Sequence, residues 1–285
     1  MARAGMKIAI TGGNGELGRD LVAYLLEQGH ETIVLDCKPP AETLLAEYRP
    51  VDVRDFEKVL GGLRDCNALV HLAAQRRLMN QPDAALYSNN TNGSYNALSA
   101  AAELGIVRIC LASSVNAIGG FYSRTARYDY FPVDEQHLGY AEDGYSLSKW
   151  VLERQADAFA RRCPSMHIAS LRFHGLCESD AAAIDSTQRL GSAAARHLWS
   201  YTLRREASRA CLLALTADYV GHEVFFIVAP RTAAALPSLD LARQYYPTTE
   251  IRGDLSNHAA FYCTAKAERL LGWKHEDPAK TCPIC

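Results

Sequence analysis

Long apolar runs are missing from this chain of 285 residues. No stretch approaches the roughly 18 consecutive apolar residues that a bilayer-spanning helix requires. The N-terminal segment passes within a few residues into a glycine-rich loop, which leaves no room for the apolar core of a signal peptide. We therefore expect a cytoplasmic protein without a membrane partner.

An excess of one charge is also missing. The chain has 30 Lys and Arg against 32 Asp and Glu, a formal net charge of −2, and no basic block. A dedicated nucleic-acid binder normally shows clustered Lys and Arg, so we expect no nucleic-acid partner. Hydrophobic residues make up 48% and charged residues 22%, which is typical of a folded protein with little extended disorder.

Paired metal-ligand motifs are scarce. The nine cysteines are scattered along the chain, and without a secretion signal we expect reduced thiols. One short spacing, Cys282-Pro-Ile-Cys285, lacks the second ligand pair of a zinc site. We therefore expect no metal.

Short apolar segments alternate with helical patterns, and no repeat or low-complexity linker interrupts them. Strands are predicted at 7–11, 32–35, 68–72, 107–112 and 167–173, an extended piece at 51–54, and helices after the loop at 12–18 and over 56–63, 91–104 and 145–161. This order predicts an α/β fold with a doubly wound parallel sheet. The rhythm breaks at 178–198 and after 229. We expect 1–177 and 199–229 to bind a dinucleotide, and 178–198 and 230–285 to form a small substrate-binding region.

Glycines stand at three spaced positions after the first predicted strand, in the segment Thr11-Gly-Gly-Asn-Gly-Glu-Leu-Gly18. At this spacing Gly12 permits a tight turn, Gly15 lets the backbone approach a pyrophosphate, and Gly18 allows the helix to pack closely on the strand. The positive end of the helix then faces the phosphates. Asp36 ends the next strand, where a carboxylate can accept hydrogen bonds from both hydroxyls of an adenosine ribose, which favours NAD over NADP.

These motifs resemble the extended short-chain dehydrogenase/reductases, that is, the NAD-dependent epimerase/dehydratase family with its TGxxGxxG loop. Further landmarks occur in order at 52–53, 71–74 and 90–94. The resemblance implies a Rossmann-type fold, NAD as cofactor, and a set of residues that contact it: Gly12, Gly15, Glu16, Leu17, Gly18, Asp36, Asp52, Val53, Leu72, Ala73, Ala74, Asn90, Tyr145 and Lys149.

Tyr145 and Lys149 lie one helical turn apart and project from the same helix face. A nearby cation favours the phenolate, so we expect Lys149 to lower the pKa of Tyr145. The resemblance implies that Tyr145 is the general acid/base, that Lys149 also binds the nicotinamide ribose, and that Ser114, rather than Ser113, hydrogen-bonds the reacting oxygen. Such a site interconverts an alcohol and a carbonyl.

The residues after Ser114 bear on the substrate. Val115 and Asn116 stand where sugar dehydratases of the family carry an acidic pair, which disfavours dehydration. The stretch 113–122 is similar to uronate dehydrogenases, apart from these two residues. We expect Gln75, Asn116 and His174 to contact a small hydroxyl or carbonyl compound, although backbone groups could equally satisfy His174. The aromatic and arginine-containing loop at 119–144 is either a lid or an ordinary surface loop.

Three functions stay open. The leading one is an NAD-dependent dehydrogenase or reductase. The second is an epimerase that keeps tightly bound NAD, and the third is a dinucleotide sensor without turnover, which would have no need of Ser114, Tyr145 and Lys149. We also expect a homodimer that pairs through the helices at 91–104 and 145–161, because the second has apolar groups around more of its girth than one buried stripe needs.

Overall fold

Seven parallel strands form the central sheet of the computed structural model, which describes residues 5–40, 46–76 and 82–276. The strands are β1 (Lys7–Thr11), β2 (Glu31–Asp36), β3 (Glu47–Pro50), β4 (Ala68–His71), β5 (Arg108–Ser114), β7 (His167–Phe173) and β10 (Gly221–Ile227). Their order is β10-β7-β5-β4-β1-β2-β3, and every pair is parallel. The predicted Rossmann-type fold is therefore confirmed. The Cys282-Cys285 spacing lies outside the described residues.

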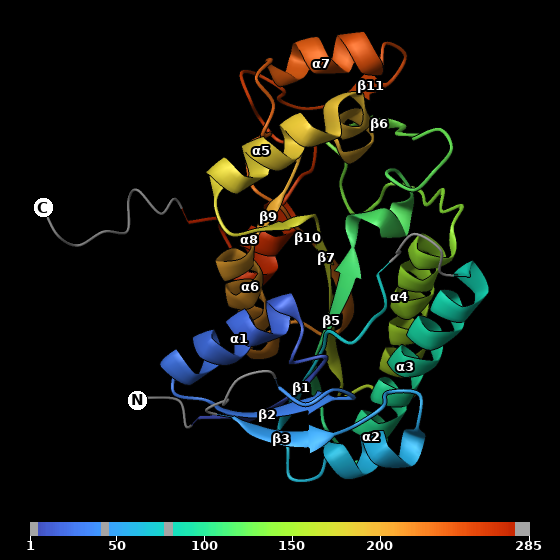
Figure 1. Cartoon of the computed structure of the whole chain (residues 1–285), viewed down its shortest axis with the longest axis vertical. Helices are drawn as coiled ribbons and strands as arrows, with labels where there is room; N and C mark the ends of the chain where they lie inside the picture. Colours follow the sequence, from blue (N-terminus) through green and yellow to red (C-terminus); the bar gives the residue numbers. More distant parts are fainter. Residues whose placement is uncertain (1–4, 41–45, 77–81, 277–285) are drawn as a thin grey trace, which may run out of the picture.

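Helices cover both faces of this sheet (Figure 1). On one face lie α1 (Glu16–Glu27), α6 (Arg204–Thr216) and α8 (Ala265–Leu271), and on the other lie α2 (Phe56–Gly62), α3 (Asp83–Glu103) and α4 (Gly144–Arg162). Strand residues alternate between the two core layers: Ile8 and Ile10 pack with α1, whereas Ala9 packs with the opposite layer. None of the helices in these described ranges is both long and apolar enough to cross a membrane.

The helical faces follow from the spacing of their apolar residues. In α1, Leu17, Leu21 and Leu25 recur every fourth residue and are all buried against the sheet. In α4, Leu152 and Phe159 fill the other layer beside α3. Asp143 fixes where α4 begins, because its side chain accepts hydrogen bonds from the backbone N–H groups of Tyr145 and Ser146, each at 3.0 Å.

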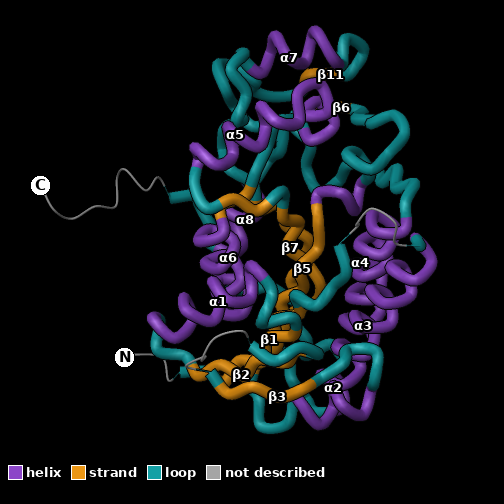
Figure 2. The backbone as a smooth tube through the Cα atoms, in the orientation of Figure 1, coloured by secondary structure: helices purple, strands orange, loops and turns teal. Residues whose placement is uncertain are grey.

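A second region covers the carboxyl ends of the strands (Figure 2). It contains α5 (Asp180–Leu190), the 3₁₀ helix η2 (Gly191–His197), α7 (Ser238–Tyr245), and two small sheets that pair β6 (Tyr130–Phe131) with β11 (Glu250–Ile251) and β8 (Leu176–Cys177) with β9 (Thr202–Leu203). A further 3₁₀ helix, η1 (Val115–Ile118), continues β5. Phe131, Trp199 and Phe261 share the core of this region, so the 119–144 loop packs against the C-terminal segment.

Several element boundaries differ from the predictions. The prediction of an extended piece at 51–54 is wrong, because β3 ends at Pro50. The chain then turns, and the Asp52 side chain accepts a hydrogen bond from the Arg54 N–H. Helix α3 begins at Asp83 rather than near residue 91. The prediction missed its first turns because they are largely exposed and carry little apolar periodicity. Strand β10 was not predicted.

Candidate active site

A cavity of about 700 Å³ lies where β1, β2, β4, β5 and β7 end. The strand order reverses beside β1, which is where doubly wound sheets bind ligands. The cavity is lined by nearly all the residues that the sequence singles out: Gly12, Gly15, Glu16, Leu17, Gly18, Asp36, Asp52, Val53, Leu72, Ala73, Ala74, Gln75, Ser114, Asn116, Tyr145, Lys149 and His174. Only Asn90 of that set does not line it.

The glycine loop forms one end of the cavity. Gly12 has a φ of +70°, and a Cβ there would lie 2.8 Å from the Ala73 backbone. A Cβ at Gly18 would lie 2.5 Å from the carbonyl oxygen of Gly13, so only glycine allows α1 to approach the loop this closely. Gly15 caps α1 without a side-chain hydrogen bond, so the N-terminus of the helix is free to face an anionic group.

Asp36 lies beside this loop at the end of β2. Its Oδ2 accepts a hydrogen bond from the Asn14 N–H, and its Oδ1 accepts one from the Lys38 N–H, each at 3.1 Å. The two backbone groups fix the orientation of the carboxylate. The Arg19 guanidinium donates to the carbonyl oxygen of Asn14, the same residue whose N–H binds Asp36, at 2.8 Å.

Asp52 and Val53, two of the predicted cofactor contacts, also line the cavity. The Asp52 carboxylate is already paired. Arg54 donates to it from both Nε and Nη2, and these hydrogen bonds lower the pKa of Asp52 to about 2. Asn90 lies behind the cavity wall. Its amide donates to Gln75 O at 3.0 Å and accepts from Gln75 N–H at 2.7 Å, so it holds the segment after β4 in place.

Ser114 and Ser113 point to opposite sides at the end of β5. The Ser113 hydroxyl donates to Glu153 Oε1 at 2.7 Å, beneath the sheet end, and is thereby occupied. The Ser114 side chain lies near enough to Tyr145 to lower the pKa of its phenol, and Ser114 accepts a hydrogen bond from the Asn116 N–H at 3.1 Å. Both serines line the cavity, so the assignment of Ser114 rather than Ser113 to the reacting oxygen stays a prediction.

Tyr145 and Lys149 project from the first turns of α4 toward the same cavity. The Lys149 ammonium lies 5.8 Å from the centre of the Tyr145 ring and donates a hydrogen bond to the Ala112 carbonyl at 2.7 Å. Tyr122, from the 119–144 loop, stacks edge-on against Tyr145 with ring centres 5.7 Å apart. The loop therefore contributes at least one side chain to the cavity wall.

The expected lowering of the Tyr145 pKa is wrong for this structure. Burial raises the pKa of Tyr145 to about 12, and the hydrogen bond from Ser114 only partly opposes this. Lys149, whose ammonium donates to the Ala112 carbonyl, is not among the groups that shift the pKa of Tyr145 most. Burial also lowers the pKa of Lys149 to about 8, against the opposing charge of Glu153. Near neutral pH the phenol is thus protonated.

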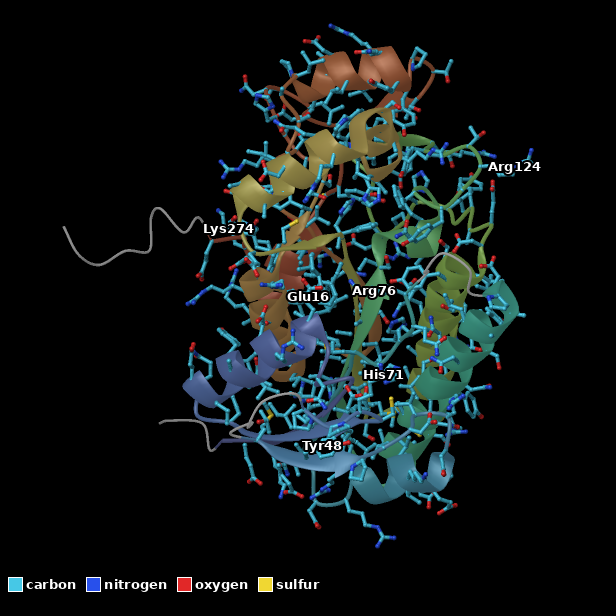
Figure 3. All side chains as sticks on the ribbon, in the orientation of Figure 1. Glu16, Tyr48, His71, Arg76, Arg124 and Lys274 are labelled. Carbon is cyan, nitrogen blue, oxygen red and sulfur yellow. The ribbon has the colours of Figure 1, made fainter. Side chains whose placement is uncertain are left out.

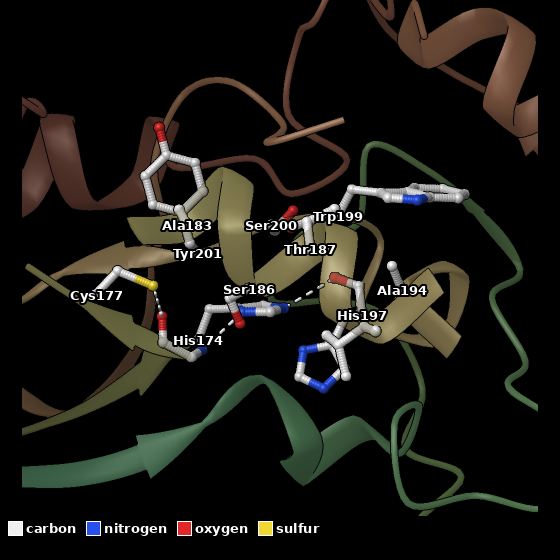
Figure 4. Close-up of a pocket in the computed structure, with 12 residues that line it drawn as sticks. His174, Cys177, Ala183, Ser186, Thr187, Ala194, His197, Trp199, Ser200 and Tyr201 are labelled. Atoms are coloured by element: carbon white, nitrogen blue, oxygen red, sulfur yellow. Dashed lines mark hydrogen bonds between the residues drawn. The ribbon is translucent and has the colours of Figure 1, made fainter. Parts of the chain in front are cut away.

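The far end of the cavity contains two histidines beside Asn116. His174 is satisfied by the backbone: its Nδ1 accepts a hydrogen bond from the Gly175 N–H at 2.6 Å, and its Nε2 lies 2.8 Å from the carbonyl oxygen of His197. Figure 4 shows the His174 ring beside a smaller pocket of about 50 Å³ formed with α5. His174 still lines the main cavity, so a substrate contact there stays a prediction.

Some lining residues carried no local signal in the sequence. His197 comes from η2, far along the chain from the cofactor motifs. Arg76 lies two residues after the 71–74 landmark and is not part of it. Arg76 and Glu16 lie at the middle of the molecule in Figure 3, and their charged groups are 3.6 Å apart. Only the fold brings these side chains to the cavity.

The residues present fit a dinucleotide. The close contacts at Gly12 and Gly18 keep the loop bare of side chains, the N-terminus of α1 is open to a pyrophosphate, and Asp36 is oriented by two amides. The cavity runs from Asp36 past the glycine loop to Lys149 and Tyr145. The same residues would hold the adenosine, pyrophosphate and nicotinamide parts of NAD in that order.

Known proteins resemble this chain in sequence. Residues 8–177 match the model of the NAD dependent epimerase/dehydratase family. The chain is 29% identical over 180 residues to dTDP-6-deoxy-L-talose 4-dehydrogenase (NAD(+)) of Aggregatibacter actinomycetemcomitans, covering 61% of this chain and 63% of that protein. It is 31% identical over 165 residues to a putative UDP-glucose 4-epimerase of Methanocaldococcus jannaschii, covering 54% and 51%. The matched part is less than two thirds of either relative.

Solved structures share the fold over nearly the whole chain. A short-chain dehydrogenase/reductase superfamily protein of Agrobacterium tumefaciens with bound NAD superposes with a TM-score of 0.71 at 22% identity, over 96% of this chain and 94% of that one. A mutated uronate dehydrogenase gives 0.69 at 21% identity, over 96% and 83%. The family model covers more than half of the chain, and the protein therefore belongs to the NAD-dependent epimerase/dehydratase family.

Proposed function

We propose that the protein is an NAD-dependent oxidoreductase that transfers hydride between the nicotinamide and a small hydroxyl or carbonyl compound, sugar-derived compounds included. The observation that carries the proposal is the convergence of Ser114, Tyr145 and Lys149 on the cavity that also contains the glycine loop. NAD, when bound, supplies or accepts the hydride at the substrate carbon.

The chain's own residues then handle the proton. Ser114 hydrogen-bonds the substrate oxygen, and the Tyr145 hydroxyl donates its proton to that oxygen as a carbonyl is reduced. In the reverse direction the Tyr145 phenolate accepts the proton of the alcohol as it is oxidised. The raised pKa of Tyr145 provides the protonated phenol that carbonyl reduction needs. Lys149 orients the nicotinamide ribose and keeps a positive charge near the Tyr145 ring.

The decisive experiment combines cofactor binding and turnover. Hydroxy compounds and sugar acids are screened with NAD for the absorbance of the reduced cofactor. Tyr145→Phe should abolish turnover and leave NAD affinity nearly unchanged, because the ring packing is retained and only the proton carrier is lost. Lys149→Ala should impair both. Full activity in Tyr145→Phe would refute the assignment.

A second candidate is an epimerase that oxidises and re-reduces the same carbon with tightly held NAD. The match to a putative UDP-glucose 4-epimerase supports it. An epimerase gives no net reduction of the cofactor in solution, whereas a dehydrogenase does. The dinucleotide sensor is disfavoured by the intact set of Ser114, Tyr145 and Lys149, which binding alone does not need.

For the substrate, we propose that the region formed by 178–198 and 230–285 closes over the cavity end that holds Asn116 and His174. Supporting this, α5, η2 and α7 lie above the carboxyl ends of the strands (Figure 1). Helix α8 of the same stretch packs instead on the core beside α6. We place Gln75, Asn116 and His174 in contact with substrate.

We further propose a homodimer in the cytoplasm. Helices α3 and α4 pack side by side, and their outer faces leave Tyr95, Leu147 and Trp150 exposed by 48%, 40% and 40%. Aromatic and aliphatic side chains exposed together favour an interface. Light scattering should give twice the monomer mass, and Trp150→Glu should reduce it to the monomer. A monomeric wild-type protein at micromolar concentration would refute the pairing.

A further inference from the structure

His197 occupies a defined position at the substrate end of the cavity. It is the last residue of η2, and its ring packs between Phe121 and His174, with ring centres 3.7 Å and 4.8 Å away. Figure 4 shows the His197 ring beside that of His174, and His197 also lines the main cavity together with Ser114 and Asn116. The packing holds the imidazole in one orientation.

The Nε2 atom of His197 is buried and has no hydrogen-bond partner. Within the described ranges, nine side-chain polar atoms share that property, and His197 is the one residue among their owners that lines the main cavity. A buried nitrogen without a partner destabilises the protein, so such an atom in a ligand cavity points to a bound ligand as its partner. His174 offers no such capacity, because both its nitrogens already meet backbone groups.

The charge state of His197 limits what it can recognise. Burial and the neighbouring His174 lower the pKa of His197 to about 2, so the ring stays neutral at physiological pH. A neutral imidazole forms hydrogen bonds to uncharged groups but no ion pair with a carboxylate or phosphate.

We propose that Nε2 of His197 hydrogen-bonds an uncharged hydroxyl or carbonyl oxygen of the substrate, distinct from the reacting oxygen held by Ser114 and Tyr145. This inference rests on the proposed function, since it presumes that a substrate enters this end of the cavity. It makes His197 a specificity-determining residue and implies a substrate with at least two oxygen functions, as in a monosaccharide.

Two substitutions at this position separate hydrogen bonding from packing. His197→Phe keeps a ring against Phe121 and His174 but removes both nitrogens, whereas His197→Gln keeps a hydrogen-bonding group but removes the ring. A hydrogen-bonding role predicts that Phe is the more damaging change, and a packing role predicts the reverse. His258→Phe makes the same replacement at an exposed position and serves as the control.

The measurement is equilibrium binding to protein saturated with NADH, using D-glucose, D-galactose, D-galacturonate and UDP-glucose as probes. At least one probe should bind the wild type, His197→Phe should weaken it about tenfold, and His197→Gln should stay within about threefold. NADH affinity should be unchanged in all variants, and His258→Phe should match the wild type.

Each other outcome has a distinct meaning. The inference is overturned if no probe binds the wild type, if His197→Phe binds as well as the wild type, or if His197→Gln is the weaker variant. Binding that follows the expected order without any turnover of the same probes would support His197 while refuting the proposed function. Mono-deoxy analogues of the bound sugar then locate the contact, because deleting the recognised hydroxyl weakens the wild type but not His197→Phe.

Discussion

The carboxylate of Glu153 accepts two hydrogen bonds from the guanidinium of Arg172, at 2.9 and 2.8 Å, and Glu153 is fully buried. Ser113 donates a third, at 2.7 Å. These contacts join α4, β5 and β7 directly behind the residues assigned to catalysis. Glu153 lies one helical turn after Lys149, and its negative charge opposes the effect of burial on the pKa of Lys149.

We predict that Glu153→Gln destabilises the protein by about 3–5 kcal/mol, because it leaves the buried charge of Arg172 uncompensated. Glu31→Gln is the matched control. It removes an ion pair with Lys7 that is 2.9 Å long but largely exposed on the Glu31 side, so it should cost less than about 1 kcal/mol. Urea denaturation measures both, and equal losses would contradict the importance of the buried pair.

The pKa of Lys149 predicts a pH dependence of cofactor binding. Burial in the folded protein lowers the pKa of this ammonium from its usual value of 10.5 to about 8. The positive charge beside the nicotinamide ribose is therefore present below about pH 8 and is lost above it, so NAD affinity should fall as pH rises through about 8. Between these two pKa values the unfolded chain binds more protons at this residue, so Lys149 itself makes folding stability rise with pH there.

Fluorescence titration of NAD across this pH range tests the predicted fall in NAD affinity. Lys149→Gln carries no titrating charge and should bind weakly, without the fall near pH 8. A wild-type affinity that is independent of pH would show that the charge of Lys149 is not used in binding.

Local sequence predicted most of the fold and much of the cavity. The spacing of the three glycines and the four-residue interval between Tyr145 and Lys149 depend only on turn and helix geometry, and the structure brings both motifs to one cavity. Strand ends in a parallel sheet meet at one edge, so Asp36, Leu72 and Ser114 come together as well.

Long-range packing decided the rest. The raised pKa of Tyr145 comes from its burial, and the Lys149 ammonium donates to the Ala112 carbonyl; neither can be read from a five-residue motif. His197 meets His174 across 23 residues of chain through an insertion with no recognisable pattern. Asn90 matched a cofactor motif but lies behind the wall, where it holds Gln75.

Two glycines predict opposite outcomes for the same substitution. Gly18→Ala places a Cβ 2.5 Å from a backbone oxygen that cannot move aside, so it should displace α1, destabilise the fold and abolish NAD binding. Gly61→Ala in α2 meets nothing within 4 Å and should stabilise the protein by about 0.5–1 kcal/mol. Thermal unfolding and NAD titration of both variants test this, and normal NAD binding by Gly18→Ala would contradict the close approach.

The last prediction concerns the choice between NAD and NADP. The amides of Asn14 and Lys38 hold the Asp36 carboxylate at the end of β2, oriented toward the position of the adenosine ribose. A 2′-phosphate there would bring like charges together at a cost of about 1–4 kcal/mol. Two cations lie nearby, Arg19, whose guanidinium donates to the Asn14 carbonyl, and the exposed Lys38, and either would offset part of this cost.

The native protein should therefore bind NAD more tightly than NADP, and Asp36→Ala should narrow or reverse the ratio of the two dissociation constants. Asp218→Ala removes the same charge from an exposed position after α6 and should leave the ratio unchanged. Tighter binding of NADP by the native protein, or an unmoved ratio in Asp36→Ala, would show that Asp36 does not select the cofactor. Selection would then have to come from another group near the ribose, for which Lys38→Ala is the next variant to measure, because removing its charge should weaken NADP more than NAD.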